Sequence, residues 1–173
     1  MKITAKARIK NLLGGSTLSA LRALPKKDAR VKVGFPGGEV DGGIIEHAYF
    51  NEFGTRGNGK GFKTDRGGGF GGPIPERPFL RNAMDNNRGK YQANMVIAGQ
   101  HVTEAIAKGS DPAAAMRQAL SKLGIMAQGD IQEEITSLSS PPNSPTTIRL
   151  KGSSNPLIDS GEMRAAVTWK INE

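Results

Sequence analysis

Two long stretches with helical hydrophobic spacing constrain the fold more than any other feature of this sequence. Within residues 78–108 and 111–138, mostly apolar side chains recur every three or four positions, which is typical of amphipathic helices about 40 Å long. Gly109 ends the first stretch, and Asp111-Pro112 suits the cap and first position of the second. The short link predicts an antiparallel helical hairpin over 78–138. The two stripes are Leu80, Met84, Asn87, Tyr91, Met95, Ala98, Val102 and Ile106, and then Met116, Leu120, Leu123, Met126, Ala127, Ile131, Ile135 and Leu138.

Two short segments alternate apolar and polar residues, as half-buried strands do. Residues 29–35 place Val31, Val33 and Phe35 on one face, and residues 164–171 place Val167, Trp169 and Ile171 on one face. We expect these two strands to pair. The sequence therefore predicts one α+β domain over residues 1–173, with a small, mostly antiparallel sheet packed against the hairpin.

The remaining segments are short helices and loops. Residues 16–24 repeat leucine at helical spacing, and residues 44–53 form a second short helix that Gly54 ends. Nine of the 19 residues in 54–72 are glycine, so we expect this segment to be a long loop with no sheet of its own. Residues 139–160, rich in Ser and Pro, are predicted to be a second loop.

The net charge of +8 is concentrated at the N-terminus. Residues 1–32 hold nine Lys or Arg and one acid, a sum of +8, so residues 33–173 sum to zero. Residues 1–28, a basic arm with the short helix, could contact DNA or an acidic protein surface. A solvated basic helix face is the alternative interpretation.

Catalytic and metal-binding chemistry finds little support in the sequence. The chain has no cysteine, and His47 and His101 lie far apart, outside any metal-ligand spacing. Gly54 to Lys60 reads G-x-x-x-x-G-K, but Gly61 stands where a phosphate-binding loop needs Ser or Thr. We therefore predict no enzyme activity, no catalytic or metal residues and no cofactor.

No apolar run approaches the ~20 residues that span a bilayer, and no signal peptide is recognisable. We therefore expect no membrane partner and a protein that is made and used in a cytoplasm.

Basic residues of the arm and of the glycine-rich loop are the candidate interaction residues. Arg66-Gly67-Gly68-Gly69-Phe70 is similar to the Arg-Gly segments that bind single-stranded nucleic acid, or is a loop that orders against a protein partner. A basic nucleic-acid-binding protein is therefore an alternative function. The candidate residues are Lys6, Arg8, Lys10, Lys26, Lys27, Arg56, Lys60, Lys63 and Arg66.

Three motifs occur in order along the chain. Residues 48–55 read A-Y-F-N-E-F-G-T, residues 74–81 read I-P-E-R-P-F-L-R, and residues 147–164 run from T-I-R-L-K-G to P-L-I-D-S-G-E-M-R. Together they resemble the neck and tail-completion proteins of long-tailed bacteriophages, the minor tail protein Z-like family. The matching structural residues are Asn51, Glu52, Phe53, Gly54, Pro75, Arg77, Pro78, Phe79, Leu80, Pro156, Leu157, Asp159 and Gly161.

The resemblance implies a structural virion protein that completes the tail and joins it to the head. Its expected partners are further copies of itself in a ring, with a hexamer favoured over a dodecamer, the tail terminator or tail tube protein, and the head connector proteins. DNA in the lumen is a further possible contact of the basic arm. The expected location is the neck, or tail end, of the virion.

Overall fold

The computed structural model describes residue 22 and residues 29–56, 62–64, 67–69 and 73–172 of the chain. Contacts along the chain divide it into two compact units. Unit 1 comprises Met1–Lys32, Gly89–Ile125 and Lys170–Glu173, and unit 2 comprises Val33–Arg88 and Met126–Trp169. The helix expected over residues 16–24 lies outside the described residues, except for Arg22.

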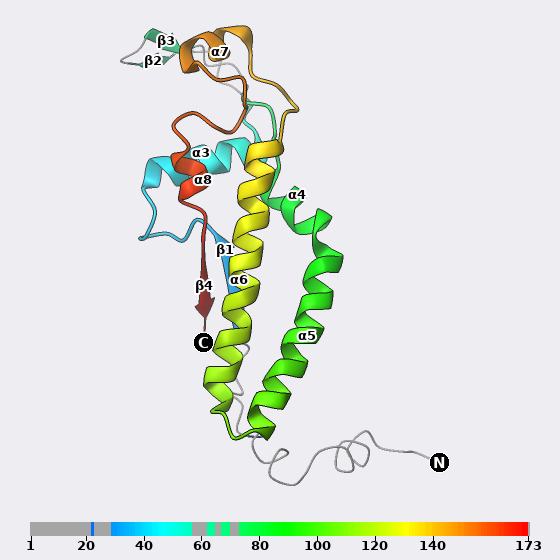
Figure 1. The fold of residues 1–173 in the computed structure, drawn as a ribbon. Coiled ribbons are helices and arrows are strands. Elements are labelled where there is room, and N and C mark those ends of the chain that lie inside the picture. Colours follow the sequence, from blue (N-terminus) through cyan, green and yellow to red (C-terminus); the bar gives the residue numbers. More distant parts are fainter. Residues whose placement is uncertain (1–21, 23–28, 57–61, 65–66, 70–72, 173) are drawn as a thin grey trace. The chain divides into compact units, whose positions relative to one another are not determined.

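Unit 1 is built around the predicted antiparallel hairpin (Figure 1). Helix α5 (Arg88–Ala107) runs to a turn at Gly109, whose φ is +89°, and the first half of α6 (Pro112–Ser137) runs back beside it. The predicted cap is confirmed, because the Asp111 Oδ2 accepts a hydrogen bond of 2.8 Å from the Ala114 amide. Four small or branched residues bury the seam between the helices: Val102, Ile106, Ala115 and Ala119.

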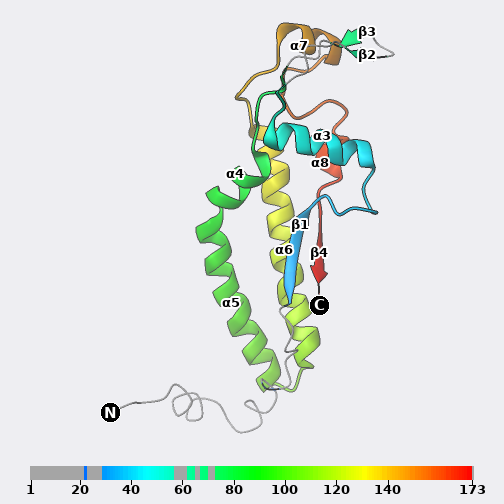
Figure 2. The ribbon, with the colours of Figure 1, turned by 180° about the vertical axis from the view of Figure 1, so that it is seen from behind.

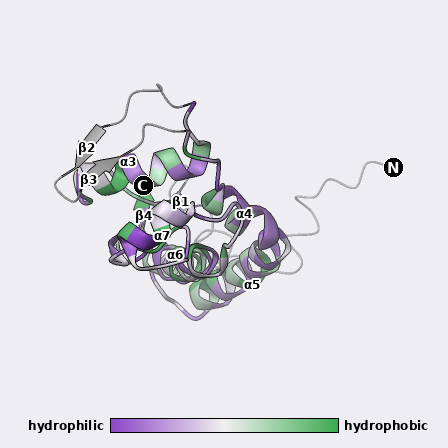
Figure 3. Cartoon of the chain, turned by 90° about the horizontal axis from the view of Figure 1, so that it is seen from above, coloured by the Kyte–Doolittle hydropathy of each residue, from purple (hydrophilic) through white to green (hydrophobic). Residues whose placement is uncertain are grey.

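The first arm of the predicted hairpin is two helices rather than one. Helix α4 (Phe79–Asn86) ends at Asn87, which has φ −102° and ψ 7°, before α5 begins at Arg88. The Asn87 Nδ2 donates to the Ala83 carbonyl at 2.9 Å, so its side chain competes for the backbone one turn back. The polar residue in the apolar stripe therefore marks the break. Figure 3 shows hydrophobic and hydrophilic residues mixed along α5.

Unit 2 has the larger core. Helix α3 (Gly42–Phe53), α4 and the second half of α6 contribute to it, and Figure 2 shows these elements from behind. Phe79, Ile131, Ile135 and Val167 are almost completely buried, and Phe35 meets Phe79 edge-to-face at 6.2 Å between ring centroids. The core residues are Ala48, Phe79, Ala83, Ile131, Ile135, Leu138, Leu157 and Val167.

The predicted pairing of the two strands is confirmed, and with it the α+β class. β1 (Arg30–Gly34) pairs with β4 (Thr168–Asn172) in a two-stranded sheet. The predicted start of the second strand at residue 164 was wrong, because Glu162–Ala165 form a short helix, α8, after Gly161. Gly161 has φ +86°, a value that reverses the chain into the helix and delays the strand.

Two segments expected to be loops contain regular structure. β2 (Phe62–Thr64) pairs antiparallel with β3 (Gly67–Gly69), because strand pairing needs backbone groups and glycine supplies them. Helix α7 (Pro145–Lys151) interrupts the Ser/Pro-rich segment. The Ser144 Oγ accepts from the Thr147 amide at 3.1 Å, and Pro145 occupies the first turn, where its missing N–H costs nothing.

Candidate functional site

Glu52, from the first motif, caps the helix that follows the second motif. Its side chain is 3% exposed on the buried face of α3, next to Ala48 in the helical pattern. Its carboxylate accepts hydrogen bonds from the Leu80 amide at 2.9 Å and from the Arg81 amide at 3.2 Å. These amides belong to the first turn of α4, which has no capping side chain of its own. A buried carboxylate 27 residues before α4 therefore serves as its N-terminal acceptor.

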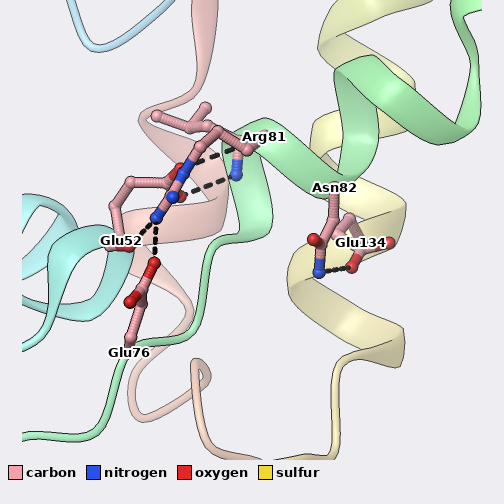
Figure 4. A network of polar contacts seen from close by, with 6 residues as sticks. Glu52, Glu76, Arg81, Asn82 and Glu134 are labelled. Atoms are coloured by element: carbon pink, nitrogen blue, oxygen red, sulfur yellow. Dashed lines mark hydrogen bonds and ion pairs between the residues drawn. The ribbon is translucent and has the colours of Figure 1, made fainter.

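Arg81 closes this contact from the solvent side. Figure 4 shows its guanidinium between Glu52 and Glu76. The Nε donates to the Glu52 Oε1 at 3.0 Å, and one Nη donates both to the Glu52 carbonyl at 2.7 Å and to the Glu76 carboxylate. Hydrogen bonds to Glu52 and then to Glu76 raise the pKa of Arg81 above its ordinary value. On the far side of α4, Asn82 donates to Glu134 of α6 at 2.9 Å.

Arg77 fastens the second motif to the chain 64–66 residues later. The residue is 5% exposed, and its guanidinium donates to the Pro141 carbonyl at 2.8 Å, the Asn51 Oδ1 at 3.1 Å and the Pro142 carbonyl at 3.2 Å. A longer contact of 3.3 Å reaches the Asn143 Oδ1. Burial lowers the pKa of Arg77. The planar guanidinium nevertheless finds hydrogen-bond acceptors on both of its sides.

The third motif joins the same region through two asparagines. The Asn143 Nδ2 donates to the Asn155 carbonyl at 3.2 Å, and the Asn155 Nδ2 donates to the Thr136 carbonyl at 2.8 Å. The Asn155 Oδ1 accepts from the amides of Leu157 and Ile158, which fixes the turn that buries Leu157. Residues from all three motifs are therefore linked by hydrogen bonds within unit 2.

The two ends of the glycine-rich segment are tied together. The Thr55 amide donates to the Ile74 carbonyl at 2.9 Å, and the Ile74 amide donates to the Thr55 Oγ1 at 3.0 Å. Gly54 has φ +67°, and a Cβ built there would lie 3.0 Å from the Ile74 carbonyl oxygen. Glycine is therefore needed at this position both for its conformation and for the close approach.

A pocket of about 330 Å³ lies where the first and third motifs meet. Helix α3 lines it with Ile44, His47 and Asn51, one helical face. The Lys151 Nζ is held there by the carbonyls of Asn155 at 2.7 Å and Pro156 at 3.3 Å. Burial lowers the pKa of Lys151, with Asp159 acting in the opposite direction. The other lining residues are Pro156, Leu157, Asp159, Ser160, Gly161, Glu162 and Met163.

Exposed apolar side chains gather on three helices. Tyr49 and Phe53 stand on α3, the run Met95-Val96-Ile97 stands on α5, and Ile148 and Leu150 stand on α7. Exposed apolar patches can mark sites of protein contact or ligand-binding grooves. Within the described residues, no group of three or more His, Asp or Glu side chains lies close enough together to hold a metal ion.

The structure places the motif residues close together. Of the nine predicted interaction residues, it describes only two. Phe79, Pro156 and Leu157 are buried, and Asp159 lines the pocket. Arg56 is exposed, and Lys63 falls in β2. The other predicted interaction residues lie outside the described parts of the chain: Lys6, Arg8, Lys10, Lys26, Lys27, Lys60 and Arg66.

Three polar residues of the site were not among the predicted site residues: Arg81, Asn143 and Asn155. Arg81 directly follows the apolar Phe79-Leu80 pair at the helix start, and each asparagine sits beside a proline or serine in a turn-rich segment. A turn-forming asparagine beside proline was the available signal for Asn143 and Asn155. Nothing in the sequence indicates their hydrogen-bond partners.

Comparisons with models of known protein families, with curated proteins and with solved structures found no match for this chain. Among the described helices, none combines the length and apolarity that crossing a bilayer demands.

Proposed function

We propose that this protein is a non-enzymatic structural part of the neck of a tailed bacteriophage, where it completes the tail and joins it to the head connector. The observation that carries the proposal is two adjoining sets of hydrogen bonds at the end of α3, those between Glu52 and Arg81 and those from Arg77 to Asn51 and Asn143, which together we call the network. Residues from each of the three family-like motifs enter this network, either directly or through Asn143 and Asn155. The resemblance therefore rests on residues that share one structural task, instead of three unrelated similarities.

The network suits an assembly subunit because it specifies geometry. Burying Glu52 and Arg77 costs desolvation, and such charges contribute more to one defined arrangement than to net stability. Here they fix the end of α3, the start of α4 and the turns at 141–143 and 155–158 relative to one another. A ring subunit needs this, because closure requires the same angle at every contact.

The proposed partners follow from the same reading. Copies of the chain would form a ring, with a hexamer favoured, between the tail terminator or tail tube and the head connector. The exposed apolar residues of α3, α5 and α7 supply contact surface for such neighbours. The basic arm would face DNA in the lumen or an acidic protein surface.

The test is a null mutant of the phage, examined by electron microscopy. Filled heads lying apart from tails of finished length, rejoined when the wild-type chain is supplied, are the expected result. Normal joined particles, or infected cells without phage DNA synthesis, would contradict the proposal. A variant unable to form the network, Arg77→Leu, should fail to complement, whereas Glu133→Ala on the exposed side of α6 should succeed.

A further inference from the structure

One face of α3 carries a cluster of exposed aromatic rings. Tyr49 and Phe53 are 58% and 56% exposed, and their ring centroids lie 4.8 Å apart. Phe50 lies 6.2 Å from Tyr49, and the Arg81 guanidinium sits 5.4 Å from the Phe53 centroid. Aromatic residues and arginine dominate the energetic centres of protein interfaces. We call Tyr49, Phe50 and Phe53 the aromatic face.

Acidic residues predominate in the segment that carries the aromatic face. Residues 33–53 contain four acids and no Lys or Arg, a net charge of −4. One of the four, Glu52, is buried, while Glu39, Asp41 and Glu46 are exposed. The surface therefore fits a segment that is both apolar and positively charged.

The N-terminal arm of this chain has that chemistry. Residues 1–28 hold seven Lys or Arg and one acid, a sum of +6, and Leu18, Leu21 and Leu24 recur at helical spacing. Leucine side chains suit the aromatic rings, and Lys or Arg suits both the flanking carboxylates and the ring faces. Fully extended, the 28 residues of the arm could span roughly 95 Å, ample reach for a neighbouring subunit. The leucines are Leu12, Leu13, Leu18, Leu21 and Leu24.

We propose that the aromatic face of α3 binds the basic N-terminal arm, residues 1–28, of a second copy of the chain. The arm and the face are different surfaces of one subunit, so each copy gives its arm to one neighbour and receives an arm from the other. Such heterologous contacts close into rings when the geometry allows. The inference rests on the proposed function in that it takes the chain to form a ring.

A cross-linking experiment tests the contact directly, because the chain contains no cysteine. The full-length Lys10→Cys variant is mixed with a tagged, heavier Glu46→Cys variant under mild oxidation. A disulfide-linked mixed dimer is expected, at a yield about tenfold above that of the matched pair Lys10→Cys and Glu133→Cys. Equal yields for the two pairs would overturn the proposal. So would a disulfide that forms only when both cysteines are in the same chain.

Association measurements provide the energetic test. In sedimentation of the full chain, Tyr49→Ala with Phe53→Ala should raise the dissociation constant about tenfold or more, as expected for aromatic hot spots. The exposed Ile125→Ala on α6 is the control and should leave the dissociation constant within about twofold. Glu46→Lys should weaken association, and Lys10→Glu with Lys6→Glu in the same chain should restore part of it. Equal weakening by the α3 pair and by Ile125→Ala, or no restoration, would contradict the arm-to-face contact.

The two proposals fail separately. If mixed dimers do not form while the null mutant still yields unjoined heads and tails, only the arm-to-face contact is wrong. If the arm instead binds duplex DNA with a steep salt dependence and gives no cross-link, the contact is likewise overturned. If the mixed dimer forms but the null mutant still yields normally joined particles, the arm-to-face contact stands and the neck function is wrong.

Discussion

Replacing Glu52 by alanine should destabilise unit 2 far more than the loss of a surface acid. The side chain is 3% exposed, and it accepts three hydrogen bonds, from the Leu80 amide, the Arg81 amide and the Arg81 Nε. Alanine removes all three acceptors and leaves two amides at the start of α4 without their partner. Water can reach Arg81, which is half exposed, so its lost ion pair counts little.

The expected loss of stability follows from the hydrogen bonds that the substitution removes. Removal of an N-terminal cap costs about 1 kcal/mol, and up to about 2 when it is well ordered. Leaving a buried amide unsatisfied adds about 1–2 kcal/mol. We therefore expect Glu52→Ala to lower the free energy of unfolding by about 2–4 kcal/mol. Glu52→Gln keeps one oxygen acceptor without the charge and should lose about 1–2 kcal/mol.

Urea denaturation followed by circular dichroism measures these losses through the midpoint at unchanged slope. Glu133→Ala, an exposed acid on α6, is the matched control and should change stability by less than about 0.5 kcal/mol. A Glu52→Ala loss as small as that of the control would refute the capping role. A loss in Glu52→Gln as large as in Glu52→Ala would show that charge, rather than hydrogen bonding, carries the effect.

Four further predictions concern other parts of the chain. Gly54→Ala should cost about 2–3 kcal/mol in urea denaturation, because alanine is strained at φ +67°. Ile135→Ala, at a fully buried position, should cost about 2–5 kcal/mol, against less than about 0.5 for the exposed Ile125→Ala. Arg77→Lys should lose about 2 kcal/mol despite its retained charge, because an ammonium cannot reach the separate acceptors that the guanidinium bridges. Burial lowers the Lys151 pKa, so the unfolded chain binds this proton more strongly. The stability of the wild type relative to Lys151→Met should therefore rise as the pH approaches 10.5, and a flat difference would contradict this.

Sequence periodicity could predict the elements whose cause is local. The stripes of α5 and α6, the Asp111 cap and the alternating residues of β1 all reflect contacts or capping within a few positions. Helix α7 was missed even though Ser144-Pro145 is a helix start signal, because the prolines on either side made a loop the simpler interpretation. The break at Asn87 was visible as one polar residue but not as a helix end.

The polar network could not be predicted, because its partners are far apart in sequence. Arg77 binds carbonyl oxygens 64 and 65 residues later, and a backbone carbonyl has no sequence signature. Glu52 would be taken for a solvated helix acid on composition. Its burial becomes intelligible only when the start of α4 lies against the end of α3. The motif resemblance identified both residues without indicating what either contacts.

The exposed run on α5 shows a further limit of hydrophobic patterns. Met95 belongs to the predicted apolar stripe, yet it is 58% exposed, and the neighbouring Val96 is 63% exposed. Three successive residues turn through about 200° of a helix, so Met95, Val96 and Ile97 cannot all face one neighbouring helix. Hydrophobic periodicity indicates which side chains are better buried than exposed to water, but it does not indicate which residue or molecule buries them. Val102 and Ile106, about two and three turns after Met95, are covered by α6 within unit 1. More than half of Met95 stays exposed in the described chain, and there the pattern indicates a surface open to another molecule.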